Sequence, residues 1–280
     1  WLELLWSMGL LTRQPAGDVW AYGVADALAP YLLAGAADDC RHALRHRLHT
    51  LAEFAGQLPA WLTRDAIEPA ASASAWAQAG QSHLAQEQRA VTAKVALDCV
   101  AGLPGLDGER WFLDLGGGPG QVAIALAHAH PQWRGRVFDL PDAVAVAADS
   151  IAAAGLAPRL QACGGDLARD PLGEGYHLIW CSSVLHFAPD LHTALARIAA
   201  ALAPGGYLIS LHAERPQQAA DAAAVLPYYL PLLLRGRHVW REGELARALP
   251  AHGLHLAAPI QSHSLPLAPA PAIIARKPMP

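Results

Sequence analysis

The chain has 280 residues, of which 53% are hydrophobic and 16% charged, and its formal net charge at pH 7 is −4. This composition is typical of a folded globular protein, and the length predicts one large domain with a smaller one beside it. The acidic balance argues against a nucleic-acid partner, because such partners usually require a basic face. No apolar run is long enough to span a bilayer, so we expect no membrane partner either.

The cysteines indicate a reducing compartment. They lie far apart without a Cys-x-x-Cys pair, which favours free thiols over a disulfide framework or a zinc site. We find no signal peptide and therefore expect a cytoplasmic location. The chain begins at Trp1 within a helical pattern, from which we expect further residues upstream. The four cysteines are Cys40, Cys99, Cys163 and Cys181.

The first hundred residues are predicted to be mostly helical. Residues 1–11 (WLELLWSMGLL) read as a helix that is apolar nearly all round, and residues 18–24 (DVWAYGV) suit a short strand. Two longer helical patterns follow at 37–62 and 75–101, separated by a stretch rich in proline, alanine and serine.

From residue 111 onward, short apolar runs alternate with helical segments. This alternation predicts an α/β fold, with a parallel sheet covered by helices on both faces. The last two runs are joined by a short loop, which favours an antiparallel hairpin at one edge of the sheet. The seven predicted strands are WFLDL, RVFDL, APRLQAC, YHLIWC, YLISLH, HLAAPIQSHS and AIIARK.

A glycine-rich loop follows the first of these strands, in the sequence WFLDLGGGPGQ. Ligands of parallel sheets bind at the carboxyl ends of the strands, where the strand order reverses, so the loop is a candidate ligand site. A dinucleotide fingerprint requires glycine or alanine at the third position of its GxGxxG pattern, but Gln121 holds that position. The loop therefore departs from the dinucleotide pattern.

Two carboxylates indicate a different ligand. Asp114 precedes the glycines, where its charge would repel a pyrophosphate but suit an ammonium group. Asp139 ends the second strand, where a carboxylate can accept hydrogen bonds from two ribose hydroxyls. A ligand with an ammonium group and a ribose but no phosphate is S-adenosylmethionine, and we predict it as the cofactor.

Several motifs then resemble a known family in order and spacing. FLDLGGGPGQ, FDLPDAV, GGDLARDPL, SSVLHFAPD and LAPGGYLI are similar to those of the S-adenosylmethionine-dependent O-methyltransferases of the caffeate and hydroxyindole type, which include bacterial natural-product enzymes. The resemblance extends over residues 1–280 and is strongest between 110 and 210. It implies a Rossmann-like seven-stranded methyltransferase sheet, methylation of a small and aromatic acceptor, and a role in secondary metabolism.

The resemblance also implies roles for individual residues. His186, in the motif VLH, matches the catalytic base of the family. The implied cofactor contacts are Asp114, Gly116 and Gly118 at the methionine part, Asp139 with its neighbour Leu140 at the ribose, Asp166 and Leu167 at the adenine, and Ser182 after the fourth strand.

The N-terminal region resembles the winged-helix-like dimerisation module of the same family. Residues 1–104 would form this mostly helical domain, of which the front part lies outside the chain, and residues 105–280 would form the methyltransferase domain. The resemblance therefore implies a homodimer. A DNA-binding regulator is the alternative for a winged helix, but residues 1–11 contain no lysine or arginine to contact phosphates.

The expected histidine base departs from the family pattern in one respect. The family orients this histidine with acidic partners, but His212 and His238 occupy the corresponding places here, and Glu214 lies two residues after the first of them. If these two histidines converge with His186, a divalent metal and C-methylation beside a keto group are an alternative.

Two further points stay open at this level. Residues 225–236 (VLPYYLPLLLRG) suit a lid helix, with Tyr228 and Tyr229 as walls for a flat acceptor or simply as part of a domain interface. Some proteins of this shape use S-adenosylmethionine only as an auxiliary in hydroxylation or decarboxylation. No residue names the acceptor, or decides between O-, C- and N-methylation.

Overall fold

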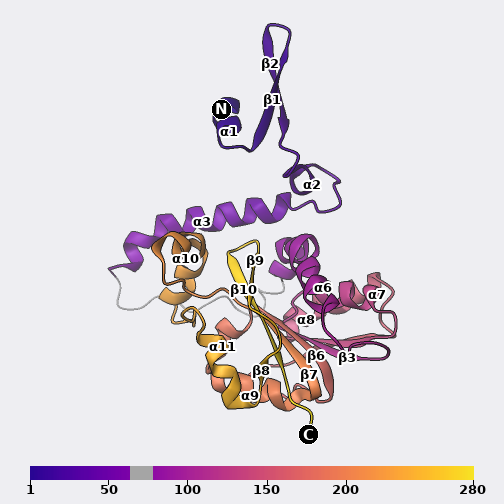
Figure 1. The fold of residues 1–280 in the computed structure, drawn as a ribbon. Helices are drawn as coiled ribbons and strands as arrows, with labels where there is room; N and C mark the ends of the chain where they lie inside the picture. The colour runs from indigo at the N-terminus through magenta and orange to yellow at the C-terminus, as the bar shows by residue number, and fades with distance from the viewer. Residues whose placement is uncertain (64–77) are drawn as a thin grey trace.

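A computed structural model describes residues 1–63 and 78–280 (Figure 1). The stretch expected to separate the two long N-terminal helices, and the first residues of the predicted helix 75–101, lie outside these ranges. Among the described residues, no helix combines the length and the apolar content that crossing a membrane would require.

The N-terminal segment contains a short helix and a hairpin. Helix α1 (Leu2–Ser7) is shorter than the predicted helix over 1–11, because the chain turns at Gly9, whose φ is 74°, and enters a strand. Strand β1 (Leu11–Ala16) pairs antiparallel with the predicted strand, β2 (Val19–Val24). Figure 1 shows α1 and this hairpin on the far side of α3 from the main sheet.

Arg13 holds the N-terminal segment together. Its guanidinium carbon lies 3.5 Å from the ring centre of Trp6 and 4.5 Å from that of Trp20, and its Nη1 donates to Glu3 Oε2 at 2.7 Å. These contacts join α1 to both strands of the hairpin. The segment therefore keeps its form although few of its side chains are buried.

Two long helical stretches follow, as predicted. Helix α3 (Arg41–Trp61) comes after the short α2 (Ala29–Leu32). A continuous helical run from 78 to 101 then contains two wide π turns, which the sequence did not indicate. Its parts are η1 (Gly80–Leu84), α5 (Ala85–Glu87), η2 (Gln88–Thr92) and α6 (Ala93–Ala101).

The main sheet confirms the predicted α/β class. Within the described residues it has eight strands in the order β5-β4-β3-β6-β7-β10-β8, with β9 also paired to β10. The first five are parallel, and the order reverses between β3 and β6. The carboxyl ends of β3 and β6 therefore form the switch point at which such sheets bind ligands. The parallel strands are β3 (Trp111–Leu115), β4 (Arg134–Asp139), β5 (Leu160–Gly164), β6 (Tyr176–Ser182) and β7 (Leu202–Leu211).

The predicted antiparallel hairpin at the sheet edge is present, with one correction. The run 255–264 forms two short strands rather than one, β8 (His255–Leu256) and β9 (Gln261–Ser264), and both pair antiparallel with β10 (Pro269–Arg276). Pro259 lies between them, and a proline has no N–H group to continue a ladder. This explains why seven predicted strands become eight.

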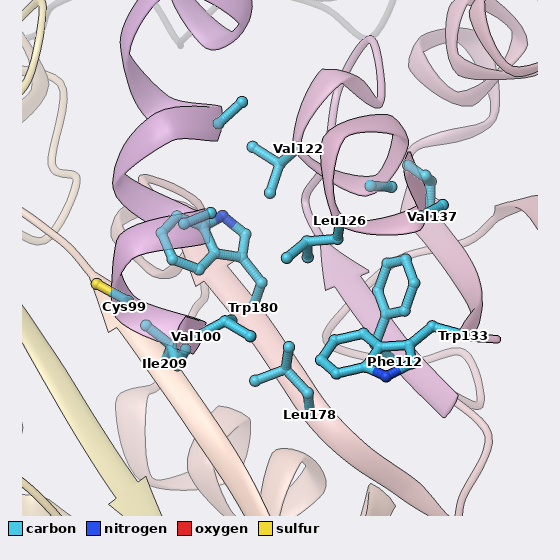
Figure 2. Close-up of a cluster of buried hydrophobic side chains, with 14 of the residues drawn as sticks. Cys99, Val100, Phe112, Val122, Leu126, Trp133, Val137, Leu178, Trp180 and Ile209 are labelled. Atoms are coloured by element: carbon cyan, nitrogen blue, oxygen red, sulfur yellow. The ribbon is translucent and has the colours of Figure 1, made fainter. Parts of the chain in front are cut away.

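Helices cover both faces of the sheet, and alternate strand residues supply the two cores. Phe112, Leu178 and Trp180 point into one core with α6 and α7, where Figure 2 shows them beside Leu126. Their neighbours along the strands point into the other core with α9. The remaining helices are α7 (Gln121–Ala129), α8 (Pro141–Ala153), α9 (Leu191–Ala201), α10 (Ala219–Leu234) and α11 (Glu244–Ala248), with 3₁₀ turns η3 (Leu185–Phe187) and η4 (Leu249–His252).

Candidate active site

The glycine loop leaves β3 at the switch point and enters α7. Gly116, Gly118 and Gly120 have φ values of 69°, 53° and 75°, in the left-handed region that residues with a side chain rarely adopt. A Cβ atom at Gly116 would overlap Val184, and one at Gly117 would lie 2.7 Å from Asp114 Cγ. Packing against the protein itself thus requires glycine at 116 and 117, whereas a Cβ atom at Gly118 would meet only Gln88 Nε2, at 3.7 Å.

Asp114 lies beneath this loop. Its side chain is only 1% exposed, and its Oδ2 accepts a hydrogen bond from the backbone N–H of Ala123 at 3.2 Å, in the first turn of α7. Burial raises the pKa of Asp114 to about 7, and the charge of Asp139 acts in the same direction. The carboxyl group therefore titrates near neutral pH.

Asp139 holds the loop from the other side. Its Oδ2 accepts from the N–H of Gly118, and its Oδ1 accepts from the N–H of Leu140, both at 2.7 Å. Each oxygen keeps a lone pair that these two bonds do not use. Burial raises the pKa of Asp139, and its two backbone hydrogen bonds oppose that effect. The structure thus brings five of the predicted residues together, namely Asp114, Gly116, Gly118, Asp139 and Leu140.

The other predicted cofactor residues lie at or just after the ends of β5 and β6. Asp166 follows β5, and its Oδ1 accepts from the N–H of Ala168 at 2.8 Å while about half of the side chain stays exposed. Leu167 packs partly buried against the second core. The N–H of Gly165 donates to the carbonyl of Asp139 at 2.9 Å, which ties this turn to the end of β4. Ser182 ends β6, where its Oγ accepts from Trp180 Nε1 at 3.3 Å.

His186 lies in η3, directly after β6, and is 1% exposed. Its Nδ1 lies 2.8 Å from the carbonyl oxygen of His238 and must donate to it, so the neutral ring carries its free lone pair on Nε2. Nε2 is buried and has no hydrogen-bond partner among the described residues. Burial lowers the pKa of His186 to about 4, so the ring is neutral at pH 7.

Aromatic rings surround His186. Trp240 stacks on it with ring centres 5.1 Å apart and planes at 22°, and Tyr229 of α10 meets it edge-on at 5.1 Å. Ser183, directly after the end of β6 at Ser182, has a φ of 54°, and its side chain hydrogen-bonds Tyr229. A residue with a side chain in this region stores strain, which is common at functional sites.

His212 approaches His186, but it does not orient that ring through a hydrogen bond in the way the family's acids would. The two ring centres are 5.2 Å apart. His212 Nε2 accepts from the N–H groups of Val184 and Leu185 at 3.2 and 3.0 Å, and its Nδ1 lies 2.9 Å from Ser210 Oγ. Burial lowers the pKa of His212 well below its usual value. This histidine therefore holds the turn that carries His186.

The three histidines of the metal alternative do not form a ligand set. His238 contacts His186 through its backbone carbonyl, and it lines a hollow together with Asp190 and Glu244. Both ring nitrogens of His212 are already hydrogen-bonded within the protein. Among the described residues, no group of three His, Cys, Asp or Glu side chains is arranged to hold a metal. Glu214 instead binds the N–H groups of Gly243 and Leu245 near the start of α11.

Sequence reasoning did not single out two residues of the site. Trp240 lies about fifty residues from the histidine that it covers, so only the fold reveals the contact. Gln88 donates from Nε2 to the carbonyl of Gly117 at 3.1 Å and accepts from the N–H of Gln121 at 3.2 Å. A polar QEQ triplet (86–88) inside an apolar helical pattern was the one available signal.

Comparison with known proteins identifies the family of the chain. Residues 69–242, more than half of the chain, match the O-methyltransferase domain family, and the protein belongs to this family. It is 41% identical to 3-hydroxy-5-methyl-1-naphthoate 3-O-methyltransferase of Streptomyces sahachiroi over 81 residues, which are 29% of this chain and 24% of that enzyme. It is 32% identical to demethylspheroidene O-methyltransferase of Cereibacter sphaeroides over 178 residues, 61% of this chain and 45% of that one. The matched parts thus span less than half the length of these relatives.

A solved structure shows the same fold. Human N-acetylserotonin methyltransferase, crystallised with S-adenosylmethionine, superposes with a TM-score of 0.71 over 99% of this chain and 82% of its own, at 22% sequence identity. This likeness supports the fold, and the family match identifies the O-methyltransferase domain.

The role of His212 is tested by His212→Phe. The change leaves the N–H groups of Val184 and Leu185 buried without an acceptor, and we expect it to lower the free energy of unfolding by about 2–5 kcal/mol. His212→Gln, which keeps an acceptor oxygen, should cost less. His192→Phe, the same change at an exposed histidine, is the control. Urea denaturation measures all three, and equal small losses for His212→Phe and His192→Phe would contradict the assignment.

Proposed function

We propose that this protein transfers a methyl group from S-adenosylmethionine to a hydroxyl oxygen of a small aromatic acceptor. The observation that carries the proposal is the loop held between Asp114 and Asp139 at the switch point of the sheet. The family membership and the naphthoate enzyme among the relatives support the reaction class and an aromatic acceptor.

S-adenosylmethionine would supply the methyl group from its positively charged sulfur. The residues in and around the glycine loop fit the charges and hydroxyl groups of this cofactor. The buried carboxylate of Asp114 places a negative charge beneath the loop, where it favours the ammonium end of the cofactor through space rather than by direct contact. The free lone pairs of Asp139 suit two ribose hydroxyls. Asp166 and Leu167 follow β5, the strand beside β4, where they suit the adenine. Ser182 lies at the end of β6, on the side of His186.

His186 is the proposed base. Its ring is neutral at pH 7, so Nε2 carries a free lone pair. None of the described residues forms a hydrogen bond with Nε2. A buried polar atom without a partner is costly unless a ligand binds to it. The acceptor hydroxyl would give its proton to Nε2 as its oxygen takes the methyl group. Because the pKa of His186 is low, the proton moves only as the oxygen–carbon bond forms. Trp240 fixes the ring plane and the carbonyl of His238 fixes the tautomer.

Helix α10 suits the lid of the acceptor pocket. It packs against α3 and carries Tyr229, which covers His186 from one side. The flat faces of Tyr229 and Trp240 beside His186 suit a planar acceptor. The metal-dependent alternative is less favoured because both nitrogens of His212 are occupied, and no feature favours an auxiliary role of the cofactor.

The base is tested by His186→Gln. We expect the rate of methyl transfer to fall at least about a hundredfold, because a glutamine cannot take the proton. The affinity for S-adenosylhomocysteine should stay unchanged, since His186 lies outside the loop. Mass spectrometry of S-adenosylhomocysteine released in the presence of a panel of phenols and hydroxynaphthoates measures the rate, with His192→Gln as the control. An unchanged rate would contradict the role of His186.

The charge of Asp114 is tested by the pH dependence of binding. With a pKa of about 7, Asp114 loses its charge as the pH falls, whereas the ammonium of S-adenosylhomocysteine stays charged. Calorimetry should therefore show about twentyfold weaker binding at pH 5.5 than at pH 7.5. Asp114→Asn should bind weakly at both pH values. A wild-type affinity that does not change with pH would contradict this account.

We also propose that the N-terminal part, residues 1–104, supports a homodimer. Helix α1 has no buried residue, and a patch of large apolar side chains on α1 and the hairpin is exposed. A patch of this kind usually marks an interface, and a second copy of the chain is the proposed partner. The patch consists of Trp1, Leu2, Leu4, Trp6, Met8, Val19 and Trp20.

Light scattering tests the dimer. We expect a mass of twice the 29.6 kDa of one chain. Leu4→Glu, at a leucine that is 52% exposed on α1, should yield monomers because it places a charge in the proposed interface. Leu256→Glu changes a leucine that is 51% exposed at the sheet edge and should leave the dimer intact. A monomeric wild-type protein would contradict the proposal.

A further inference from the structure

Three consecutive side chains of the helical run 78–101 reach three different partners. Gln86 Oε1 accepts from the N–H of Ala43 in the first turn of α3, at 2.9 Å. Glu87 binds the guanidinium of Arg47 through two bonds of 2.7 and 2.6 Å. Gln88 binds the glycine loop. This triplet, residues 86–88, therefore joins helix α3 to the proposed cofactor site.

The contacts of Gln88 fall on one particular peptide unit. The carbonyl of Gly117 accepts from Gln88 Nε2 at 3.1 Å, and the N–H of Gly118 donates to Asp139 Oδ2 at 2.7 Å. These two groups belong to the same peptide plane, which is thus held at both ends. The same carbonyl also accepts from the N–H of Gly120 at 3.0 Å, a bond within the loop. Both flanking residues are glycines, which restrict rotation of the peptide plane little, so Gln88 and Asp139 add the side-chain bonds that fix its direction.

The other end of the Gln88 amide holds the start of α7. Its Oε1 accepts from the N–H of Gln121, the first residue of that helix, whose N–H has no partner within the helix. One side chain thus joins the middle of the loop to the helix that follows it. Gln88 uses both ends of its amide for this purpose, so its part in the site is to position the loop.

The position of Gln88 is itself fixed. It is the first residue of the π turn η2, and such turns often redirect a side chain at a functional site. The preceding residue, Glu87, forms its ion pair with Arg47 where both side chains are largely buried. Breaking such a pair is costly, so the helical run stays attached to α3.

We propose that Gln88 is a positioning residue that fixes the Gly117–Gly118 peptide, and through it the carboxylate of Asp139, for the nucleoside part of the cofactor. This inference rests on the proposed function for the identity of the ligand. The contacts of Gln88 with Gly117 and Gln121 do not depend on that identity.

Two variants and a matched control test the role of Gln88. Gln88→Ala removes both bonds, and Gln88→Glu keeps the acceptor for Gln121 but places an oxygen against the carbonyl of Gly117. Gln86→Ala changes the same residue type two positions earlier and breaks only the link to Ala43. Calorimetry should show about tenfold weaker binding of S-adenosylhomocysteine for Gln88→Ala, and at least as large a loss for Gln88→Glu. Gln86→Ala should bind within about twofold of the wild type.

A second readout needs no ligand. Hydrogen exchange of the free protein, followed by mass spectrometry on the peptide that contains Gly118, should be faster in Gln88→Ala than in the wild type and in Gln86→Ala. In steady state, Gln88→Ala should raise the KM for S-adenosylmethionine and leave kcat largely unchanged, which a loss of overall stability would not do.

The outcomes separate this inference from the proposed function. If the wild type fails to bind S-adenosylhomocysteine, the proposed function and this inference both fall. If the wild type binds and Gln88→Ala binds equally well with unchanged exchange at Gly118, only this inference is overturned. Weaker binding with faster exchange supports both.

Discussion

The hydrogen bond from the Gly118 N–H to Asp139 is the constraint on which the rest of the site depends. It joins the end of β4 to the loop after β3, and so converts two adjacent strand ends into one surface. Glycines at 116 and 117 let the loop pass close to Val184 and Asp114, which brings the chain into reach of this bond. A glycine-rich loop is thereby held in one conformation at the candidate site.

The parts of the fold that depend on a local sequence pattern could be predicted. Alternating apolar runs and helical segments predicted the parallel sheet and both covered faces, because buried parallel strands read as short apolar runs. Three features could not be predicted in this way. The π turns around Gln88, the early end of the first helix at Ser7 and the division of the run 255–264 all depend on packing or on single glycine and proline residues.

The residues of the site likewise differ in whether a local sequence pattern could predict them. The positions of Asp114 and Asp139 were predictable because they are the second-last and the last residue of adjacent parallel strands, whose ends meet. The function of His212 was not, since its acceptor role depends on backbone groups nearly thirty residues earlier in the chain. His212 stands where the family would have an acid, but it does not orient His186. The backbone carbonyl of His238 orients that ring instead, and His212 accepts hydrogen bonds from the turn that carries it.

A crystal structure of the complex with S-adenosylhomocysteine tests the central claim most directly. The account predicts density for the ribose against the Asp139 carboxylate, with the ammonium end above Asp114 and the sulfur on the side of His186. A nucleoside bound elsewhere, or a loop whose Gly117–Gly118 peptide has turned away from Asp139 in the complex, would contradict it.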